Sequence, residues 1–259
     1  MRRGPSYRVA QAVLRPPLRA LTRHDWRGTE HLPAEGGVVV TPNHVSFIDP
    51  LVVADLLDTV GRPPRFLAKD ELFRVPGLGP LLRDAGQIPV RRRTADASRA
   101  YLDAVAAVRR GECVVVYPEG TLTHDPAMWP MRGHTGAARI ALTTGCPVVP
   151  LGQWGAQEVM PPRKKRFHAF PRHTVHVLVG APVDLVEFVG REPTAELLHA
   201  ATDRIMAAIA ALVGELRGES APRARFDPTT MGGAAPADRP GNTDERQSGP
   251  MDSGTEQTP

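Results

Sequence analysis

Apolar and polar positions along residues 26–216 fall into two alternating patterns. Short apolar runs rich in Val and Ile are typical of buried strands, and they occur at residues 38–40, 65–68, 86–90, 113–117, 147–151 and 174–179, with a further strand expected at 26–31. Longer segments repeat their apolar residues with the period of a helix, and they occur at residues 51–58, 97–110, 133–144 and 194–216. Strands that alternate with helices predict an α/β fold, with a mostly parallel sheet flanked by helices.

The N-terminal end of the chain differs from this middle part. Residues 1–27 carry seven arginines and a single acid, with apolar residues interleaved. The pair Pro16-Pro17 is expected to break this segment into two short helical pieces. A basic amphipathic segment too short to cross a bilayer is typical of a helix on an anionic membrane surface. A helix that simply packs on the domain is the alternative interpretation.

The C-terminal end differs in another way. From Gly218 onward the composition shifts to Gly, Pro, Ser, Thr, Asp and Ala. Such a segment buries too little apolar surface to offset the entropy of ordering it, so we predict a disordered tail. The expected organisation is a membrane-surface segment at residues 1–27, a single domain at 28–217 and a tail at 218–259.

Charge and cysteine content narrow the classes of partner. The net charge of the 259 residues is +4, and the basic residues are almost all Arg, whose planar fork suits phosphate and carboxylate groups. Anionic ligands or lipids are therefore expected as partners rather than nucleic acid, although a preference for Arg codons explains the same bias. Cys113 and Cys146 lack metal-ligand spacing and indicate buried thiols in a reducing compartment.

Membrane-spanning and secretory segments are not expected. No apolar run reaches the ~18–20 residues that cross a bilayer, and the N-terminus lacks the continuous apolar core of a signal peptide. We therefore predict a peripheral location on the cytoplasmic face of the plasma membrane, with no transmembrane helix.

Residues 43–49 lie where a predicted strand gives way to a predicted helix, the edge of an α/β sheet at which ligands usually bind. An imidazole accepts a proton near neutral pH, and a carboxylate bonded to its other nitrogen fixes the tautomer and stabilises the imidazolium. His44 and Asp49 supply these two groups. In a continuous helix they would point about 140° apart, so a dyad requires a loop that bends back before Pro50 starts the helix.

Each polar residue of this stretch also has a purely structural interpretation. Asp49 suits the N-cap of the following helix, and His44 suits a loop in which its nitrogens find local partners. Asn43 and Ser46 favour turns because their side chains bond the nearby backbone. A nucleophilic role for Ser46 has little support, because no Gly-x-Ser-x-Gly elbow surrounds it.

Four sequence blocks, in order, resemble those of one family. Asn43-His44-Val45-Ser46-Phe47-Ile48-Asp49 resembles the NHxSxxD signature of the glycerophospholipid acyltransferases, the family of lysophosphatidic acid acyltransferase (1-acyl-sn-glycerol-3-phosphate O-acyltransferase). Residues 117–121, Tyr-Pro-Glu-Gly-Thr, resemble its PEGT block. Residues 86–92 fall at the place of its second block, and residues 146–151 resemble its last block, an apolar strand that ends in proline.

This resemblance implies an enzyme that transfers an acyl group from a thioester, either acyl-CoA or acyl carrier protein, to a lipid hydroxyl. It implies that His44 deprotonates the acceptor hydroxyl and that Asp49 orients His44 and stabilises its charged form. It implies no metal and no organic cofactor. The leading hypothesis is acylation of the lysophospholipid 1-acylglycerol 3-phosphate to phosphatidic acid at an anionic membrane surface, a step of phospholipid biosynthesis.

The resemblance also implies residues that hold the acceptor around the dyad. The residues at these positions are Asn43, Ser46, Arg91, Arg92, Glu119, Gly120, Thr121 and Arg132. Arg91 replaces an acid that is usual in the second block, and Leu122 replaces the arginine that commonly follows the PEGT block. Arg132 stands where it can compensate for that loss. A solvated charge run is the alternative interpretation of residues 91–93.

Other hypotheses stay open. Leu122 keeps open a different acceptor: another lysophospholipid, a lyso-ornithine lipid or a glycolipid. A hydrolase would use the same dyad on water, and a non-catalytic lipid- or thioester-binding protein would keep only the fold. The basic run at 163–166 suits coenzyme A phosphates, a membrane surface or a plain exposed loop. Trp154 suits an acyl groove, the lipid interface or the core.

Overall fold

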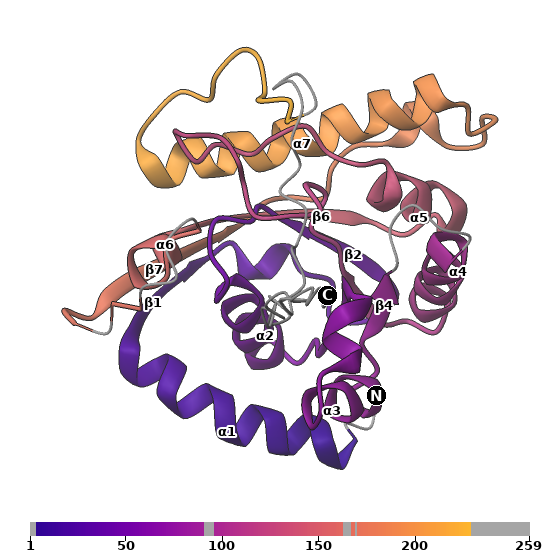
Figure 1. Ribbon diagram of the computed structural model, residues 1–259. Helices are drawn as coiled ribbons and strands as arrows, with labels where there is room; N and C mark the ends of the chain where they lie inside the picture. Colours follow the sequence, from indigo (N-terminus) through magenta and orange to yellow (C-terminus); the bar gives the residue numbers. More distant parts are fainter. Residues whose placement is uncertain (1–3, 91–95, 163–166, 169, 229–259) are drawn as a thin grey trace, which may run out of the picture. The chain divides into compact units, whose positions relative to one another are not determined.

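The computed structural model describes residues 4–90, 96–162, 167–168 and 170–228, which belong to the first of two compact units, Met1–Pro228 and Thr229–Pro259 (Figure 1). Within these residues seven strands form one sheet in the order β1-β7-β6-β2-β5-β3-β4. Neighbouring strands are parallel except β6 and β7, which are antiparallel. The predicted α/β fold is confirmed. The strands are β1 (Thr22–Arg27), β2 (Val38–Pro42), β3 (Pro64–Lys69), β4 (Ile88–Val90), β5 (Cys113–Val115), β6 (Val148–Trp154) and β7 (His173–Val179).

Helices cover both faces of this sheet. Helices α1, α2 and α6 pack on one face, and α4, α5 and α7 pack on the other (Figure 1). The α-helices are α1 (Pro5–Leu21), α2 (Asp49–Thr59), α3 (Leu78–Asp84), α4 (Asp96–Arg109), α5 (Gly136–Thr144), α6 (Ala156–Val159) and α7 (Ala195–Arg217). The short 3₁₀ helices are η1 (Thr29–His31), η2 (Asp70–Arg74) and η3 (Val186–Phe188).

Strand β2 shows how the sheet divides the core. Val39 packs in the cluster with α4, α5 and α7, whereas Val38 and Val40 pack in the cluster with α2, because successive side chains of a strand point to opposite faces. All of β2 is buried, as is typical of a parallel strand covered on both faces. Its carboxyl end therefore opens at the middle of the sheet edge, between β6 and β5.

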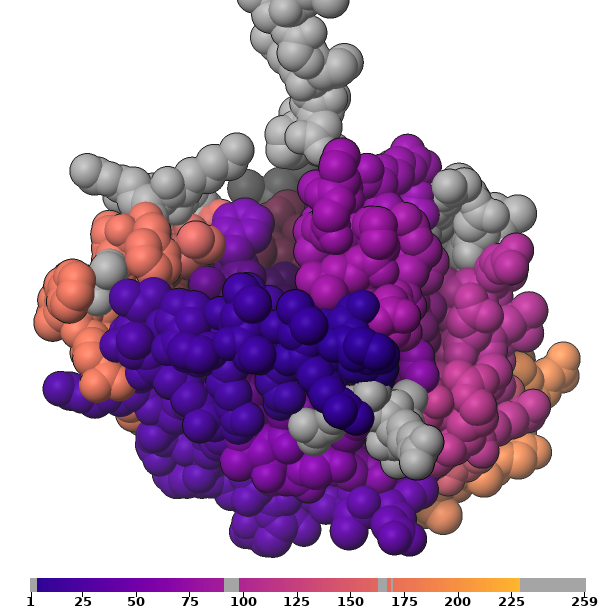
Figure 2. All heavy atoms as spheres, turned by 90° about the horizontal axis from the view of Figure 1, so that it is seen from below, coloured from indigo at the N-terminus to yellow at the C-terminus, as the bar shows by residue number. Residues whose placement is uncertain are grey.

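The N-terminal segment forms one continuous helix, α1, so the prediction of two short pieces was wrong. Pro16 and Pro17 lie inside the helix, where each removes a backbone donor at a cost of about 3 kcal/mol. Contacts with α2 oppose that cost: Leu18 is buried, and Arg15 and Arg19 form ion pairs with Asp55. The prediction considered the local backbone without this packing. Figure 2 shows α1, in indigo, lying across this face of the molecule.

The first strand begins at Thr22, earlier than the predicted range of 26–31. It pairs in parallel with β7, with Thr22 opposite His173. Gly28, with φ of 73°, follows the strand and leads into η1, which occupies the rest of the predicted range. Residues 22–27 therefore belong to the sheet, and the predicted boundary after residue 27 does not separate a membrane segment from the domain.

The tail begins later than predicted. The carbonyl of Phe226 accepts a hydrogen bond from the amide of Arg132 at 2.9 Å, and Arg225 lies 2.6 Å from Asp203 of α7. These polar contacts hold the first residues after α7 against the domain, whereas the composition argument counted only apolar burial. Residues 229–259 lie outside the described residues.

Helix α7 is the one helix in the described part of the chain that is long and apolar enough to cross a membrane, which the sequence analysis did not anticipate. An 18-residue window in it has a mean hydropathy of 1.4, and 56% of that window is buried inside the domain. Ile205, Met206 and Ile209 lie in the core cluster on the sheet. The apolar side of α7 is therefore used for packing, as in the core helix of a globular domain.

Candidate active site

Residues 43–48 form the loop from β2 to α2, at the carboxyl end of the central strand. The neighbouring strands β5 and β6 run parallel to β2, so the segments that follow them reach the same edge of the sheet. Contacts therefore join residues that are distant in sequence: Glu119 bonds to the loop across 75 residues, and Gln153 bonds to it across 110 residues.

His44 and Asp49 form the predicted dyad. Nδ1 of His44 lies 2.9 Å from Oδ2 of Asp49. The loop bends back because the same carboxylate oxygen accepts hydrogen bonds from the backbone amides of Val45 and Ser46, each at 2.7 Å. Asp49 is the first residue of α2, after Ile48 at the N-cap, and its side chain does not cap the helix. The carboxylate thus fixes the loop that precedes the helix.

Burial shapes the electrostatics of the dyad. Asp49 is fully buried, which raises its pKa, while the hydrogen bond to His44 and the two loop amides oppose that shift. A carboxylate at Nδ1 makes this nitrogen the protonated one and leaves Nε2 of His44 as the acceptor. The His44 side chain is 17% exposed. The pair therefore has the arrangement of a general base and its orienting acid.

Glu119 holds the loop from another side. Its Oε1 accepts a hydrogen bond from the backbone amide of His44 at 2.9 Å, and its Oε2 accepts one from the amide of Met131 at 3.1 Å. Burial raises the pKa of Glu119 to about 8, against the effect of these two bonds. Because both oxygens bond to the backbone, the structure gives Glu119 a supporting role at the dyad, which differs from the predicted role of holding the acceptor.

Asn43 and Ser46 are buried and fix the loop to the segments beside it. The Asn43 side chain donates to the backbone carbonyl of Gln153 at 3.0 Å and accepts from its amide at 2.8 Å. The Ser46 hydroxyl donates to the carbonyl of Met160 at 2.8 Å. These bonds match the turn-forming interpretation of both residues. They also direct the Ser46 hydroxyl to the backbone, so it has no activating bond from His44.

Tyr117 is a site residue that the sequence analysis did not single out. Its ring centroid lies 4.3 Å from that of His44, with the planes tilted by 33°, and Phe66 stacks on its side away from the dyad at 6.5 Å. Burial, together with the charge of Asp49, raises the pKa of Tyr117 well above its usual value, so the phenol is neutral. Its place directly before the Pro-Glu-Gly-Thr block was the available signal.

A family model described as Acyltransferase matches residues 23–154. The match covers just over half of the chain and includes all four sequence blocks. The chain belongs to the Acyltransferase family. Membership confirms the resemblance inferred from the blocks.

Curated relatives of this acyltransferase share one name. The chloroplastic 1-acyl-sn-glycerol-3-phosphate acyltransferase of Brassica napus is 30% identical over 183 residues, which are 68% of this chain and 51% of the relative. The enzyme of that name from Borreliella burgdorferi is 30% identical over 125 residues, 48% of either chain. The one from Bacillus subtilis is 27% identical over 190 residues, 72% of this chain and 86% of the relative. The chain thus spans about half the length of the first two relatives.

A solved structure shows the same fold. The crystal structure of the 1-acyl-sn-glycerophosphate (LPA) acyltransferase, PlsC, from Thermotoga maritima superimposes with a TM-score of 0.62 and 23% sequence identity. The superposition covers 84% of this chain and 83% of that chain. The arrangement of sheet and helices therefore extends beyond the part that the family model matches.

The remaining predicted residues of the acyltransferase site divide into three groups. Gly120, with φ of 72°, makes the turn after Glu119, and Thr121 follows it half-buried. Arg132 is 56% exposed and lies 2.6 Å from Asp227, so an ion pair on the surface engages it, and the predicted compensation for Leu122 is not supported. Arg91 and Arg92, like the basic run at 163–166, lie outside the described residues.

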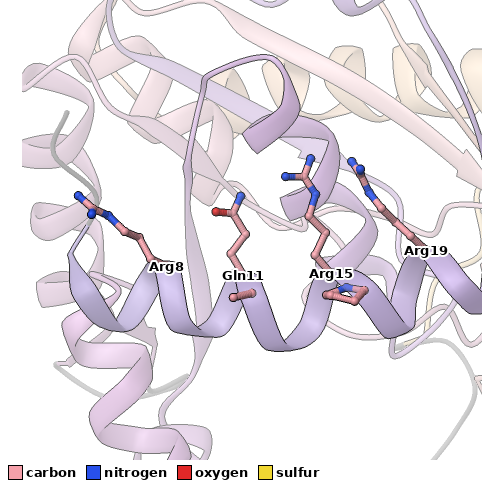
Figure 3. Close-up of a pocket in the computed structure, with 6 residues that line it drawn as sticks. Arg8, Gln11, Arg15 and Arg19 are labelled. Atoms are coloured by element: carbon pink, nitrogen blue, oxygen red, sulfur yellow. The ribbon is translucent and has the colours of Figure 1, made fainter.

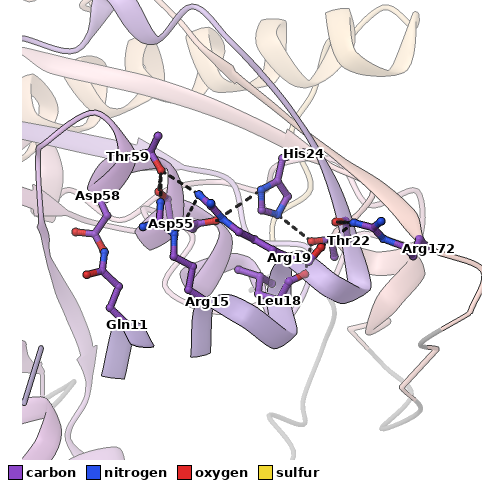
Figure 4. A network of polar contacts seen from close by, with 10 residues as sticks. All are labelled: Gln11, Arg15, Leu18, Arg19, Thr22, His24, Asp55, Asp58, Thr59 and Arg172. Carbon is purple, nitrogen blue, oxygen red and sulfur yellow. Dashed lines mark hydrogen bonds and ion pairs between the residues drawn. The ribbon is translucent and has the colours of Figure 1, made fainter. Parts of the chain in front are cut away.

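Helix α1 carries a second polar region, away from the dyad. A groove of about 350 Å³ on α1 is lined by Arg8, Gln11, Ala12, Arg15, Pro16 and Arg19 (Figure 3). Beside it, the buried Asp55 of α2 lies 2.5 Å from Arg15, 2.9 Å from Arg19 and 3.6 Å from Nδ1 of His24 (Figure 4). Burial lowers the pKa of His24, and the two arginines lower it further. This network joins α1 to the helix that begins at Asp49.

Metal and thiol chemistry have few candidates here. Among the described residues, no three His, Cys, Asp or Glu side chains form a group that could hold a metal ion. Cys113 and Cys146 are free. Burial raises the pKa of the Cys113 thiol to about 12, which matches the prediction of a buried, unreactive thiol.

Proposed function

We propose that this chain is an O-acyltransferase that moves a fatty acyl group from an acyl thioester to the free hydroxyl of 1-acylglycerol 3-phosphate and so produces phosphatidic acid. The observation that carries the proposal is the buried Asp49 bonded to Nδ1 of His44, in a loop at the centre of the sheet edge. The family match and the shared name of the curated relatives support the reaction and the acceptor.

The dyad provides a balanced route for acyl transfer. Nε2 of His44 takes the proton of the acceptor hydroxyl while that oxygen forms a bond to the thioester carbonyl carbon. Asp49 stabilises the resulting imidazolium through Nδ1. When the tetrahedral adduct collapses, the carbon–sulfur bond breaks and the imidazolium returns its proton to the departing thiolate. Base catalysis of this kind contributes ~10²–10⁴-fold, and alignment of the two substrates contributes more.

Acyl-CoA and acyl carrier protein are both candidate donors. Either one supplies the same thioester, and the proton transfers above require no metal or organic cofactor. Offering each donor with the same fatty acyl chain to the purified protein, and comparing kcat/KM for ester formation, separates the two.

A second class of acceptor has its own support. Leu122 supplies no charge at the position after Gly120 and Thr121, and Arg132 is paired with Asp227. The phosphate contact implied by the family resemblance is therefore missing at residue 122. This observation favours, as the alternative, another lysophospholipid, a lyso-ornithine lipid or a glycolipid as acceptor of the same acyl transfer.

The deciding experiment is a panel of lyso-lipid acceptors with one labelled acyl-CoA, run with wild-type protein and with His44→Ala. The proposal expects fastest ester formation with 1-acylglycerol 3-phosphate and a large loss in the variant. Faster ester formation with a different lyso-lipid would move the function to the alternative acceptor. Thiol release without acceptor, with free fatty acid as product, would identify a hydrolase. Equal, slow thiol release by both proteins would contradict an enzymatic role.

Helix α1 supports a peripheral location at the anionic cytoplasmic face of the plasma membrane. The side chains of Val9, Val13 and Leu14 are 59%, 63% and 42% exposed, while another side of the helix packs on α2. Apolar residues exposed on an arginine-rich helix suit the interface of an anionic membrane. The N-terminal segment would then both pack on the domain and touch the lipid.

Vesicle sedimentation tests this location. The double variant Val9→Glu with Val13→Glu changes only exposed side chains, and Leu102→Glu on α4, where the side chain is 61% exposed, is the matched control. We expect the double variant to lose binding to phosphatidylglycerol vesicles and the control to retain it. Equal sedimentation of the three proteins would contradict the role of α1.

A further inference from the structure

Arg217, the last residue of α7, lies between two tryptophan rings. Its guanidinium carbon is 4.2 Å from the ring centroid of Trp129 and 4.5 Å from that of Trp154, and its side chain is 10% exposed. A guanidinium over an aromatic face is attracted most strongly where water is excluded. Three parts of the chain meet at this side chain: the end of α7, the end of β6 at Trp154, and the segment 121–131 that carries Trp129.

The guanidinium also holds the backbone of this segment. Its Nη1 donates to the carbonyl of Ala127 at 2.8 Å, and its Nη2 donates to the carboxylate of Glu219 at 2.7 Å. Between Ala127 and Trp129 lies Met128, whose φ of 60° falls in the left-handed region. A residue with a long side chain rarely adopts this region, and it stays there only where the surroundings hold it.

The same segment supports the dyad at two points. The amide of Thr123 donates to the carbonyl of His44 at 2.8 Å, and the Thr123 hydroxyl donates to the carbonyl of Trp129, also at 2.8 Å. The amide of Met131 donates to Glu119, which accepts from the amide of His44. Direct contacts therefore lead from the guanidinium, through Trp129 and the segment around it, to both the amide and the carbonyl of His44.

We propose that Arg217 is a positioning residue for acyl transfer: it holds segment 121–131 in the conformation that fixes the backbone of His44. It does not touch the reacting atoms. The kinetic part of this inference rests on the proposed function, whereas its structural part can be measured without any substrate.

The kinetic test compares Arg217→Ala with a matched control, Arg204→Ala. Arg204 is also on α7, its guanidinium also lies over an aromatic ring, 5.0 Å from the centroid of Phe188, and it also bonds a backbone carbonyl, that of Asp184. Its contacts lead to η3 instead of to segment 121–131. We expect Arg217→Ala to lower kcat about 10- to 100-fold with little change in KM, and Arg204→Ala to retain wild-type kcat.

A conservative variant sharpens the comparison. Arg217→Lys keeps the positive charge but loses the planar group that stacks between two rings and the fork that reaches Ala127 and Glu219. We expect its kcat to fall between those of the wild type and Arg217→Ala. A kcat equal to that of the wild type would show that charge alone suffices, and it would overturn the role of the stacked geometry.

Hydrogen exchange provides the readout that needs no substrate. In Arg217→Ala we expect faster amide exchange in peptides that cover residues 43–49 and 121–131, with no change at β5. Unchanged exchange in residues 43–49 would overturn the proposal. Faster exchange throughout the domain would also overturn it, because it would show a general loss of stability.

Coupling to Glu119 tests the route of action. If Arg217 acts through the segment that bonds Glu119, the fold-loss of the double variant Arg217→Ala with Glu119→Gln is smaller than the product of the single losses. A fold-loss equal to that product would place the two residues on independent routes and overturn the proposal.

Two complications have defined outcomes. If Arg217→Ala does not fold, Trp154→Phe takes its place: it removes one large ring, keeps the arginine and must still speed exchange in residues 43–49, or the proposal fails. If the wild-type protein transfers no acyl group to any acceptor, the proposed function fails, while the exchange experiment still decides the role of Arg217.

Discussion

Two buried aspartates on α2 face histidines, and their surroundings differ. Asp49 bonds His44 at 2.9 Å, and its other contacts are the uncharged amides of Val45 and Ser46. Asp55 lies 3.6 Å from His24 and forms ion pairs with two arginines of α1. The first carboxylate has a histidine as its only side-chain partner among the described residues, whereas the charge of the second is already balanced.

The difference shows what makes a His–Asp pair suitable for catalysis. Where amides alone surround the carboxylate, a proton taken up by the imidazole is stabilised by a nearby full charge. Where arginines surround it, the same proton adds a further positive charge, and the lowered pKa of His24 reflects this. The pair at Asp55 is therefore suited to joining α1 to α2, and the pair at Asp49 is suited to moving a proton.

The strongest test of this comparison removes each histidine in turn. We expect His44→Ala to lower kcat by ~10²–10⁴-fold, because the general base is lost, and His24→Ala to leave kcat nearly unchanged. Initial rates of ester formation from a labelled acyl donor measure both. A loss in His24→Ala as large as that in His44→Ala would end the distinction between the two pairs.

Glu119→Gln tests the support of the first pair. The nitrogen of Gln cannot accept a hydrogen bond, whereas both carboxyl oxygens of Glu retain acceptor capacity, so either the His44 or the Met131 amide loses its partner. We expect kcat to fall about 10- to 100-fold, because the base is displaced from its alignment. If saturating acceptor restored the wild-type rate, Glu119 would hold the substrate instead of the loop.

Asp55→Asn tests the second pair. We expect the free energy of unfolding to drop by about 1–3 kcal/mol, less than the ~3–5 kcal/mol of a fully buried pair, because Arg15 and Arg19 are partly in water. The kcat should change less than in Glu119→Gln. Urea unfolding and initial rates measure the two effects. A variant of normal stability but low kcat would assign Asp55 to catalysis.

The smallest expected effect is a pH dependence of stability. Burial raises the pKa of Glu119 from 4.5 to about 8, so folding favours its neutral form. Its contribution is full below about pH 4.5 and is lost as the pH rises toward 8. Urea unfolding at pH 5 and at pH 8.5 should therefore show a smaller loss in Glu119→Gln than in the wild type. Equal losses would indicate that Glu119 is ionised in the folded protein throughout this range.

The strands that could be predicted from the sequence are those buried on both faces. Residues 38–40 and 113–117 are runs of β-branched residues, and both contain strands of the sheet centre. Strand β1 was misplaced because its residues are mostly polar and its partner is distant: Asp25 and His176, which bond across β1 and β7, are 151 residues apart. Periodicity within a short window carries no information about such a partner.

The site was predictable where side chains bond each other and hidden where they bond the backbone. His44 and Asp49 were found from residue type and spacing. The role of Glu119 was not, because its partners are backbone amides, which every residue except proline has. The ion pair of Arg132 was also hidden, because Asp227 lies 95 residues away in a segment that composition alone assigned to a disordered tail.

The pairing of β1 with β7 has a consequence for synthesis of the chain. Residues 22–27 leave the ribosome early, yet their only partner strand in the described sheet ends at Val179. At about 5–20 residues per second, a separation of 151 residues corresponds to roughly 8–30 s of elongation. Helix α1 meets α2 much sooner, because Arg19 and Asp55 are 36 residues apart. The first helix thus docks while the first strand still waits, and closing that edge of the sheet is among the last events of synthesis.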